Sequence, residues 1–160
     1  MPDLHVLRHA KAEADAPGGD RQRALTDRGR ATAAALAEHA RRTSLRVDVV
    51  LCSPARRAKE TMEPLLEALG HPDVRMDEDL YAGGVAEALE LIRALPPAAT
   101  AALVVGHNPT LQDLVETVSA DAGSVTESFP AGALASVRWD GPWSSLLSGS
   151  ARLVNVYTGS

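Results

Sequence analysis

The sequence contains a single cysteine among 160 residues, so the chain cannot form an internal disulfide. Cys52 ends the apolar run 47–52, and we interpret it as a buried core thiol, because no base lies beside it in the sequence. No uninterrupted apolar stretch approaches the length needed to cross a bilayer. The first residues also lack the basic flank and long apolar region of a secretory signal. We therefore expect a soluble cytoplasmic protein that does not associate with a membrane.

An excess of basic residues is also missing. The formal net charge is -5, whereas a protein that binds the nucleic-acid backbone normally presents a basic face, so nucleic acid is not an expected partner. Three enzyme signatures are absent as well: the glycine-rich loop ending in Gly-Lys-Ser/Thr, the dinucleotide fingerprint and the Gly-x-Ser-x-Gly elbow. These absences remove the main rival classes of enzyme.

The apolar pattern predicts short strands that alternate with helices. Hydrophobic residues make up 45% of the chain, which is enough for one domain with a continuous core. Strands are expected over 4–10, 47–52, 74–76, 101–105, 134–139 and 152–157, and helices over 26–42, 55–69, 85–95 and 110–118. We therefore expect a single domain over 1–160, a three-layer α/β/α fold whose central sheet is mostly parallel, with a mixed edge.

Two packing details are expected from the same pattern. Thr26 is a plausible N-cap for the first helix. The apolar stripe of this helix is expected at Ala31, Ala35, Leu36 and Ala40. Of the two tryptophans, Trp139 is assigned to the core and Trp143 to a lid, a choice that the sequence itself does not decide.

Three of the expected strands end in polar clusters. Arg8-His9 follows the first strand, the 53–57 segment Ser-Pro-Ala-Arg-Arg follows the second, and Gly106-His107-Asn108 follows a later one. Each cluster alone is explained by a strand leaving the core. In α/β folds, however, the carboxyl ends of adjacent strands converge on one crevice, so we expect the clusters to meet. Together they supply two histidines and at least two arginines, which predicts an anion site.

These residue types favour phosphoryl chemistry. Arginine presents a planar fork of donors to phosphate oxygens, so Arg8 and Arg57 could clamp a phosphoryl group. A neutral imidazole beside the clamp can attack phosphorus in line and form a phosphohistidine that water hydrolyses, without a metal. His9 suits the nucleophile because it ends the first strand, where backbone can fix its tautomer. His107 suits a donor to the phosphoryl oxygens.

The order and spacing of these motifs resemble the histidine phosphatase superfamily. The matching segments are Arg8-His9-Ala10, residues 53–58 with Thr61, and residues 106–109. Within the superfamily the chain is most similar to the SixA-type phosphohistidine phosphatases, over nearly its whole length. The residues that carry this narrower resemblance are Ala10, Lys11, Asp20, Arg23, Leu25, Gly29, Leu80 and Tyr81.

The resemblance implies a role for each matching position. His9 would be the phosphorylated nucleophile, and Arg8, Arg57 and His107 would surround the phosphate, with no cofactor. The neighbouring Arg56 has no assigned role.

The resemblance also bears on the proton donor. Larger relatives supply a carboxylate acid from an inserted cap, whereas residues 77–99 have room here for little beyond one helix, so a phosphoglycerate mutase-like fold with a minimal cap is implied. The proton donor is therefore expected at Asp20 or Glu13 in the first loop, with Glu87 a weaker candidate. A small cap would leave the site open to a protein substrate.

The leading interpretation is a metal-independent phosphatase that removes the phosphoryl group from phosphohistidine in a protein. One alternative is a small-molecule phosphomonoesterase with the same chemistry, and another is a catalytically silent module that binds a phospholigand. A metal pair at His5 and His9 is disfavoured, because no carboxylate or cysteine lies at ligand spacing nearby. The sequence leaves the oligomeric state open.

Overall fold

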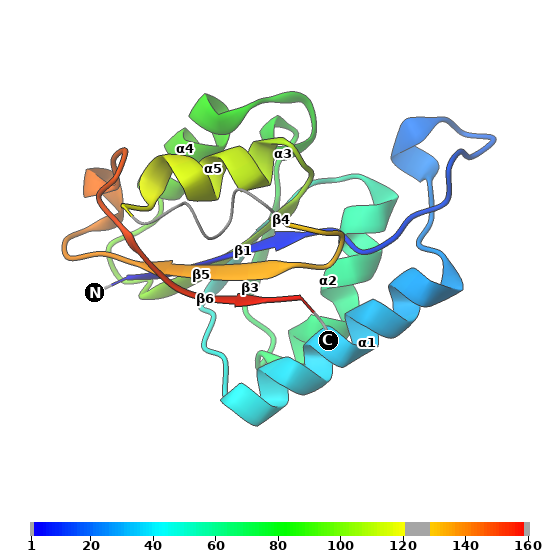
Figure 1. Cartoon of the computed structure of the whole chain (residues 1–160), viewed down its shortest axis with the longest axis horizontal. Coiled ribbons are helices and arrows are strands. Elements are labelled where there is room, and N and C mark those ends of the chain that lie inside the picture. The colour runs from blue at the N-terminus through cyan, green and yellow to red at the C-terminus, as the bar shows by residue number, and fades with distance from the viewer. Residues whose placement is uncertain (1, 121–128, 159–160) are drawn as a thin grey trace.

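The computed structural model describes residues 2–120 and 129–158, which form one mixed sheet with helices on both faces (Figure 1). The strands are β1 (Asp3–Arg8), β2 (Val49–Cys52), β3 (Asp73–Met76), β4 (Ala101–Gly106), β5 (Leu134–Arg138) and β6 (Arg152–Tyr157). The helices are α1 (Asp27–Thr43), α2 (Arg56–Ala68), α3 (Asp79–Ala82), α4 (Val85–Arg93) and α5 (Thr110–Val118), with short 3-10 turns η1 (Asp20–Gln22) and η3 (Trp143–Ser145). None of the described helices has the length and apolar character needed to span a bilayer.

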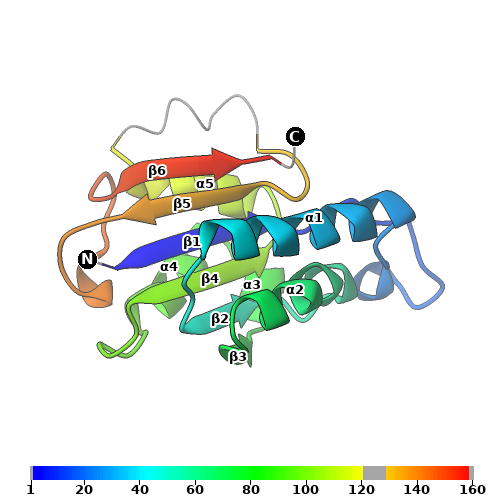
Figure 2. The same cartoon turned by 90° about the horizontal axis from the view of Figure 1, so that it is seen from below.

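The sheet order is β3-β2-β4-β1-β5-β6, which Figure 2 shows from the side of α1 and α2. β1 and β2 both run parallel to β4, and β3 runs parallel to β2. β5 is antiparallel to β1 and to β6. The prediction of a mostly parallel sheet with a mixed edge is confirmed. Because β1, β2 and β4 point the same way, their carboxyl ends lie at one edge of the sheet.

The strands alternate their side chains between two apolar layers. Leu4 and Val6 of β1 pack with residues of α4 and α5, whereas Leu7 packs with residues of α1 and α2. β4 follows the same rule and is buried along its whole length. Strands covered on both faces read as continuous apolar runs, which explains why the sequence predicted them readily.

The start of α1 is confirmed, but the predicted apolar stripe is partly wrong. The Thr26 side chain accepts a hydrogen bond from the Gly29 N–H at 3.0 Å, as an N-cap should. The buried residues of the helix are Gly29, Ala33, Leu36, Ala37 and Ala40. Ala31 is exposed and Ala35 only half-buried. The helix is so rich in alanine that apolar character alone does not reveal which face is buried.

The assignment of Trp143 to a lid is also wrong. The Trp143 side chain is buried, its indole N–H donates to the Ala99 carbonyl at 2.7 Å, and its ring packs edge to face on that of Trp139 at 5.2 Å. Ala99 lies just before β4 begins, so both tryptophans belong to the core at the edge opposite the carboxyl ends of β1, β2 and β4. The assignment of Trp139 to the core is confirmed.

Gly29 allows α1 to approach the loop that follows β1. A Cβ atom at this position would overlap with the carbonyl oxygen of Lys11, a backbone atom that cannot swing away. We expect Gly29→Ala to destabilise the protein by about 1–3 kcal/mol, as overpacking of a close contact does. Urea unfolding measures this. In Gly84→Ala the added Cβ meets nothing closer than 3.6 Å, so that variant should lose only the N-cap preference for glycine over alanine, less than about 1 kcal/mol. Equal effects of the two substitutions would contradict the close approach.

Candidate active site

The carboxyl edge of the sheet brings the three polar clusters together. Arg8 ends β1 opposite Gly106 of β4, and His9 follows with its N–H bonded to the Gly106 carbonyl at 3.0 Å. Ser53 follows β2, and its N–H donates to Val105 of β4 at 2.9 Å. A pocket of about 310 Å³ results, lined by Arg8, His9, Lys11, Ala12, Arg23, Arg57, His107, Asn108 and Ala131. The convergence expected from the strand ends is therefore present.

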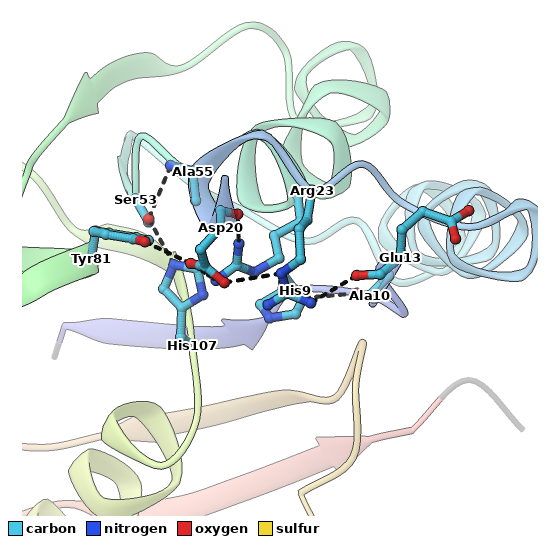
Figure 3. A network of polar contacts seen from close by, with 10 residues as sticks. His9, Ala10, Glu13, Asp20, Arg23, Ser53, Ala55, Tyr81 and His107 are labelled. Carbon is cyan, nitrogen blue, oxygen red and sulfur yellow. Dashed lines mark hydrogen bonds and ion pairs between the residues drawn. The ribbon is translucent and has the colours of Figure 1, made fainter. Parts of the chain in front are cut away.

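The His9 ring has a defined tautomer. Its Nδ1 lies 2.7 Å from the Ala10 carbonyl oxygen, which can only accept, so Nδ1 carries the proton (Figure 3). Burial lowers the pKa of His9 to about 4, and the positive charges of Arg57 and Arg8 act in the same direction. The ring is therefore neutral near pH 7, with a lone pair on Nε2.

His107 lies beside His9, with 5.1 Å between the ring centroids. Its Nε2 is 2.7 Å from the Ser53 hydroxyl oxygen, which also accepts from the Ala55 N–H. The Ser53 hydroxyl has one proton and two lone pairs, so it can donate to Nε2 while it accepts from the Ala55 N–H, and in this arrangement the His107 proton lies on Nδ1. Burial, followed by the neighbouring His9 and Arg57, lowers the pKa of His107 to about 3. This ring is therefore a neutral donor through Nδ1.

Both arginines present part of their guanidinium group to the pocket. Arg57 donates from Nη1 to the Asp20 carbonyl at 2.8 Å and from Nη2 to the Asp20 carboxylate at 3.1 Å. Arg8 donates from Nη1 to the Phe129 carbonyl at 3.1 Å. Three buried side-chain nitrogen atoms have no hydrogen-bond partner among the described residues: Arg8 Nε, Arg57 Nε and His107 Nδ1. Buried donors are almost always paired, so three together suit an anion with several acceptor oxygens.

Of the carboxylates considered as proton donors, only that of Asp20 is bonded to residues that line the pocket, Arg23 and Arg57. Figure 3 shows this carboxylate between Tyr81 and Arg23, and its charge acts on the pKa of His107. Hydrogen bonds from Tyr81 at 2.6 Å, Arg57 at 3.1 Å and Arg23 at 3.0 Å hold its pKa well below the ordinary value, with the Tyr81 bond as the largest cause. Asp20 is therefore ionised.

The other two acidic candidates lie elsewhere. Glu13 is exposed, and its side chain points away from both histidines (Figure 3). The carboxylate of Glu87 accepts from the Gly84 N–H at 2.7 Å and caps α4. Arg56 is exposed and paired with Glu60 at 3.1 Å, outside the pocket.

Sequence reasoning gave no role to several residues that shape the site. Tyr81 comes from α3, a helix of four residues that is too short to show a period, so the 77–99 span holds two helices rather than one. The Tyr81 ring meets His107 edge-on at 5.6 Å. Thr61 accepts from the Ala10 N–H at 3.0 Å, while its hydroxyl donates to the Arg57 carbonyl at 2.7 Å. Only the family resemblance had marked Tyr81, Arg23 and Thr61.

This geometry agrees with what known proteins show. The family model of the histidine phosphatase superfamily (branch 1) matches residues 4–81. A candidate phosphohistidine phosphatase SixA from Nakamurella multipartitia is 33% identical and superposes with a TM-score of 0.85, over 98% of this chain and 95% of that one. The chain belongs to the histidine phosphatase superfamily. It is accordingly a phosphatase, and its substrates carry phosphoryl groups.

Two further solved structures superpose on this chain. The protein histidine phosphatase SixA complexed with tungstate is 26% identical, with a TM-score of 0.84 over 98% of this chain and 97% of the other. A candidate alpha-ribazole-5'-phosphate phosphatase from Escherichia coli is 18% identical, with a TM-score of 0.73 over 100% and 98% of the chains, and shares the fold. The predicted phosphoglycerate mutase-like architecture is therefore confirmed.

Within the described residues of this histidine phosphatase, no group of three or more histidine, cysteine or acidic side chains is arranged to hold a metal ion. His5, considered above with His9 as a possible ligand, instead lies 2.7 Å from the Ser136 hydroxyl.

The two neighbouring arginines provide a test of the anion pocket. We expect Arg57→Ala to weaken binding of tungstate about tenfold to hundredfold, because hydrogen bonds to charged groups are worth about 1.5–3 kcal/mol. Isothermal titration calorimetry measures the affinity. Arg56→Ala removes the same charge from the next position, outside the pocket, and should change the affinity less than about twofold. The reverse ranking would place the anion at the other arginine.

The protonation state of His9 can be observed directly. Long-range ¹H–¹⁵N spectra should show a neutral ring with the proton on Nδ1 at pH 7, and titration should begin only as the pH falls toward about 4. Since the protonated ring has no lone pair, the nucleophile is lost below that pH. A His9 that titrates at its ordinary value of 6.5 would contradict the effect of burial described above.

Proposed function

We propose that this histidine phosphatase removes the phosphoryl group from phosphohistidine in a protein, through a covalent intermediate on His9. The observation that carries the proposal is the His9 ring itself, whose Nδ1–H is held by the Ala10 carbonyl while Nε2 keeps its lone pair. Arg8, Arg57 and His107 surround this ring with unpartnered donors.

In the first step, His9 Nε2 attacks phosphorus in line and the bond from phosphorus to the leaving group breaks. Arg8 Nε, Arg57 Nε and His107 Nδ1 donate to the phosphoryl oxygens and stabilise the charge that spreads over them. In the second step, water attacks the phosphoryl group and the electron pair of the P–N bond returns to His9 Nε2. Both steps of this proposal use the protein's own groups and water.

The protonation states of the site favour a nitrogen leaving group. Asp20 is ionised, and burial keeps both His9 and His107 neutral. At pH 7 the two rings can therefore donate hydrogen bonds, but none of the three groups can act as a general acid. An alkoxide leaves poorly without an acid, whereas a phosphohistidine protonated on its other nitrogen leaves as neutral imidazole. We therefore propose that Asp20 is not the proton donor expected from the sequence.

The small amount of chain above the pocket supports a protein substrate. Between β3 and β4 lie only α3, of four residues, and α4, of nine, together with their connecting segments. We propose that this minimal cap, in a single domain, leaves the phosphoryl site open to a phosphohistidine on a folded partner. The similarity to SixA proteins, one of them complexed with the oxyanion tungstate, points the same way. A small phosphoester is the second candidate, since a metabolite phosphatase shares the fold.

The test compares two substrates at equal concentration, with a chelator present: a protein phosphorylated on histidine and p-nitrophenyl phosphate. Faster phosphate release from the protein is expected, and His9→Ala should abolish release from both while tungstate still binds. Phosphate release from the ester alone would indicate that the substrate is a small phosphoester. Release from neither, with tungstate bound, would favour a silent binding module. Turnover retained by His9→Ala would exclude the covalent route, and loss of activity with chelator would indicate a metal.

A further inference from the structure

We infer that the Asp20 carboxylate determines specificity by accepting a hydrogen bond from the protonated imidazole of the substrate, and so selects cationic nitrogen leaving groups over neutral or anionic oxygen ones. This inference rests on the proposed function and deepens it, because it assigns the recognition of the leaving group to a named side chain.

The carboxylate retains an acceptor position. Each carboxylate oxygen accepts about two hydrogen bonds. Oδ2 takes both the Tyr81 hydroxyl and Arg57 Nη2, whereas Oδ1 takes only Arg23 Nε. The Asp20 side chain is 52% exposed even though its partner Arg57 is 6% exposed. One acceptor direction on Oδ1 is therefore available from the solvent side.

The position of Asp20 suits the leaving group. In an in-line displacement the leaving group departs on the side of phosphorus opposite the nucleophile, which here is the half-buried His9 ring. Asp20 lies on the exposed η1 turn and is bonded to Arg23 and Arg57, which line the pocket with His9, and its charge acts on His107. This places an acceptor on the solvent side of the pocket residues, where the leaving group departs. Tyr81 and Arg23 hold this carboxylate from two sides, so it cannot fold away as the substrate enters.

Charge makes the position selective. The pocket is lined by cations, namely Arg8, Lys11, Arg23 and Arg57, and Asp20 adds a fixed negative charge that is bonded to two of them, Arg23 and Arg57. A phosphoryl dianion next to this carboxylate is repelled, and an anionic leaving group would add to the repulsion. An imidazolium placed between the two negative groups is attracted by both. The same carboxylate therefore favours one class of substrate and opposes the other.

The chemical step balances with this assignment. The substrate imidazole carries phosphorus on one nitrogen and a proton on the other, and that N–H donates to Asp20. His9 Nε2 forms its bond to phosphorus as the substrate P–N bond breaks, and the electron pair returns to the substrate, which leaves as neutral imidazole with its proton in place. The phosphorylated His9 is then an imidazolium whose Nδ1–H donates to the Ala10 carbonyl. A hydrogen-bond acceptor thus faces each of the two imidazoles, Asp20 on the substrate side and the carbonyl on the enzyme side.

The experiment measures kcat/KM for N-phosphoimidazole and for p-nitrophenyl phosphate, whose leaving group needs no proton, in the unmodified protein and in Asp20→Asn. The two rates can both change, because the substitution also alters the contact with Arg57, so the readout is their ratio. We expect the ratio to fall about tenfold or more, the usual worth of a hydrogen bond to a charged group. In the pH profile of kcat/KM for N-phosphoimidazole, the fall on the alkaline side should also begin about one pH unit lower in Asp20→Asn. The reason is that the bound imidazolium loses its carboxylate partner, which lowers its pKa.

Two control variants separate specificity from positioning. Tyr81→Phe removes one hydrogen bond to Asp20 but keeps its charge, so the ratio should stay within about twofold. Asp20→Glu restores the charge and should recover part of the ratio. If Asp20→Asn lowers both rates equally and leaves the fall on the alkaline side in place, Asp20 only positions Arg57 and the inference is overturned while the proposed function stands. If the unmodified protein turns over the ester but not N-phosphoimidazole, both are overturned.

Discussion

The hydrogen bond from His9 Nδ1–H to the Ala10 carbonyl decides which nitrogen of the ring is free, and the rest of the site depends on it. The Ala10 peptide is itself fixed, because its N–H donates to Thr61 and its side chain is buried against Leu25 and Ala33. The loop after β1 therefore helps to fix the orientation and tautomer of the His9 ring. A weaker hold on Ala10 would let the ring exchange tautomers and lose the lone pair that faces the pocket.

Burial and positive charge act together at this edge of the sheet. They depress the pKa values of both histidines, so the positive charge of the pocket comes from its arginines and Lys11 and not from the histidine rings. A single protonated histidine could not both attract an anion and supply a lone pair, so the two tasks fall to different residues. In the proposed mechanism, Arg8 and Arg57 attract the anion and His9 is the neutral nucleophile. Asp20 orients one of these arginines without titrating near neutral pH.

The features that follow from apolar pattern and strand direction could be predicted from the sequence. The buried strands β1, β2 and β4 are continuous apolar runs, and placing their carboxyl ends together was enough to bring Arg8, Arg57 and His107 around His9. The buried face of α1 could not be predicted, because alanine occurs on every side of it.

The apolar pattern of the sequence also could not predict short elements or polar pairs between residues far apart in the chain. α3 has too few residues for a period, so the position of Tyr81 over the site was not foreseen. The state of Asp20 depends on donors that are up to 61 residues distant in sequence and meet only in the folded chain. Trp143 gave no local signal to distinguish a core position from a lid.

Helix α2 places two of the groups on which the site depends at a fixed separation. Arg57 and Thr61 stand four residues apart, so they lie one above the other on the same face, where one reaches the phosphate pocket and the other holds the Ala10 peptide. Each residue added between them would turn the second group about 100° around the helix axis. Chain length in this turn of α2 is therefore constrained in descendants of this protein and in redesigned versions of it. The connections of the 77–99 span, which carry no such pair, leave more freedom for insertions that would alter the entrance to the pocket.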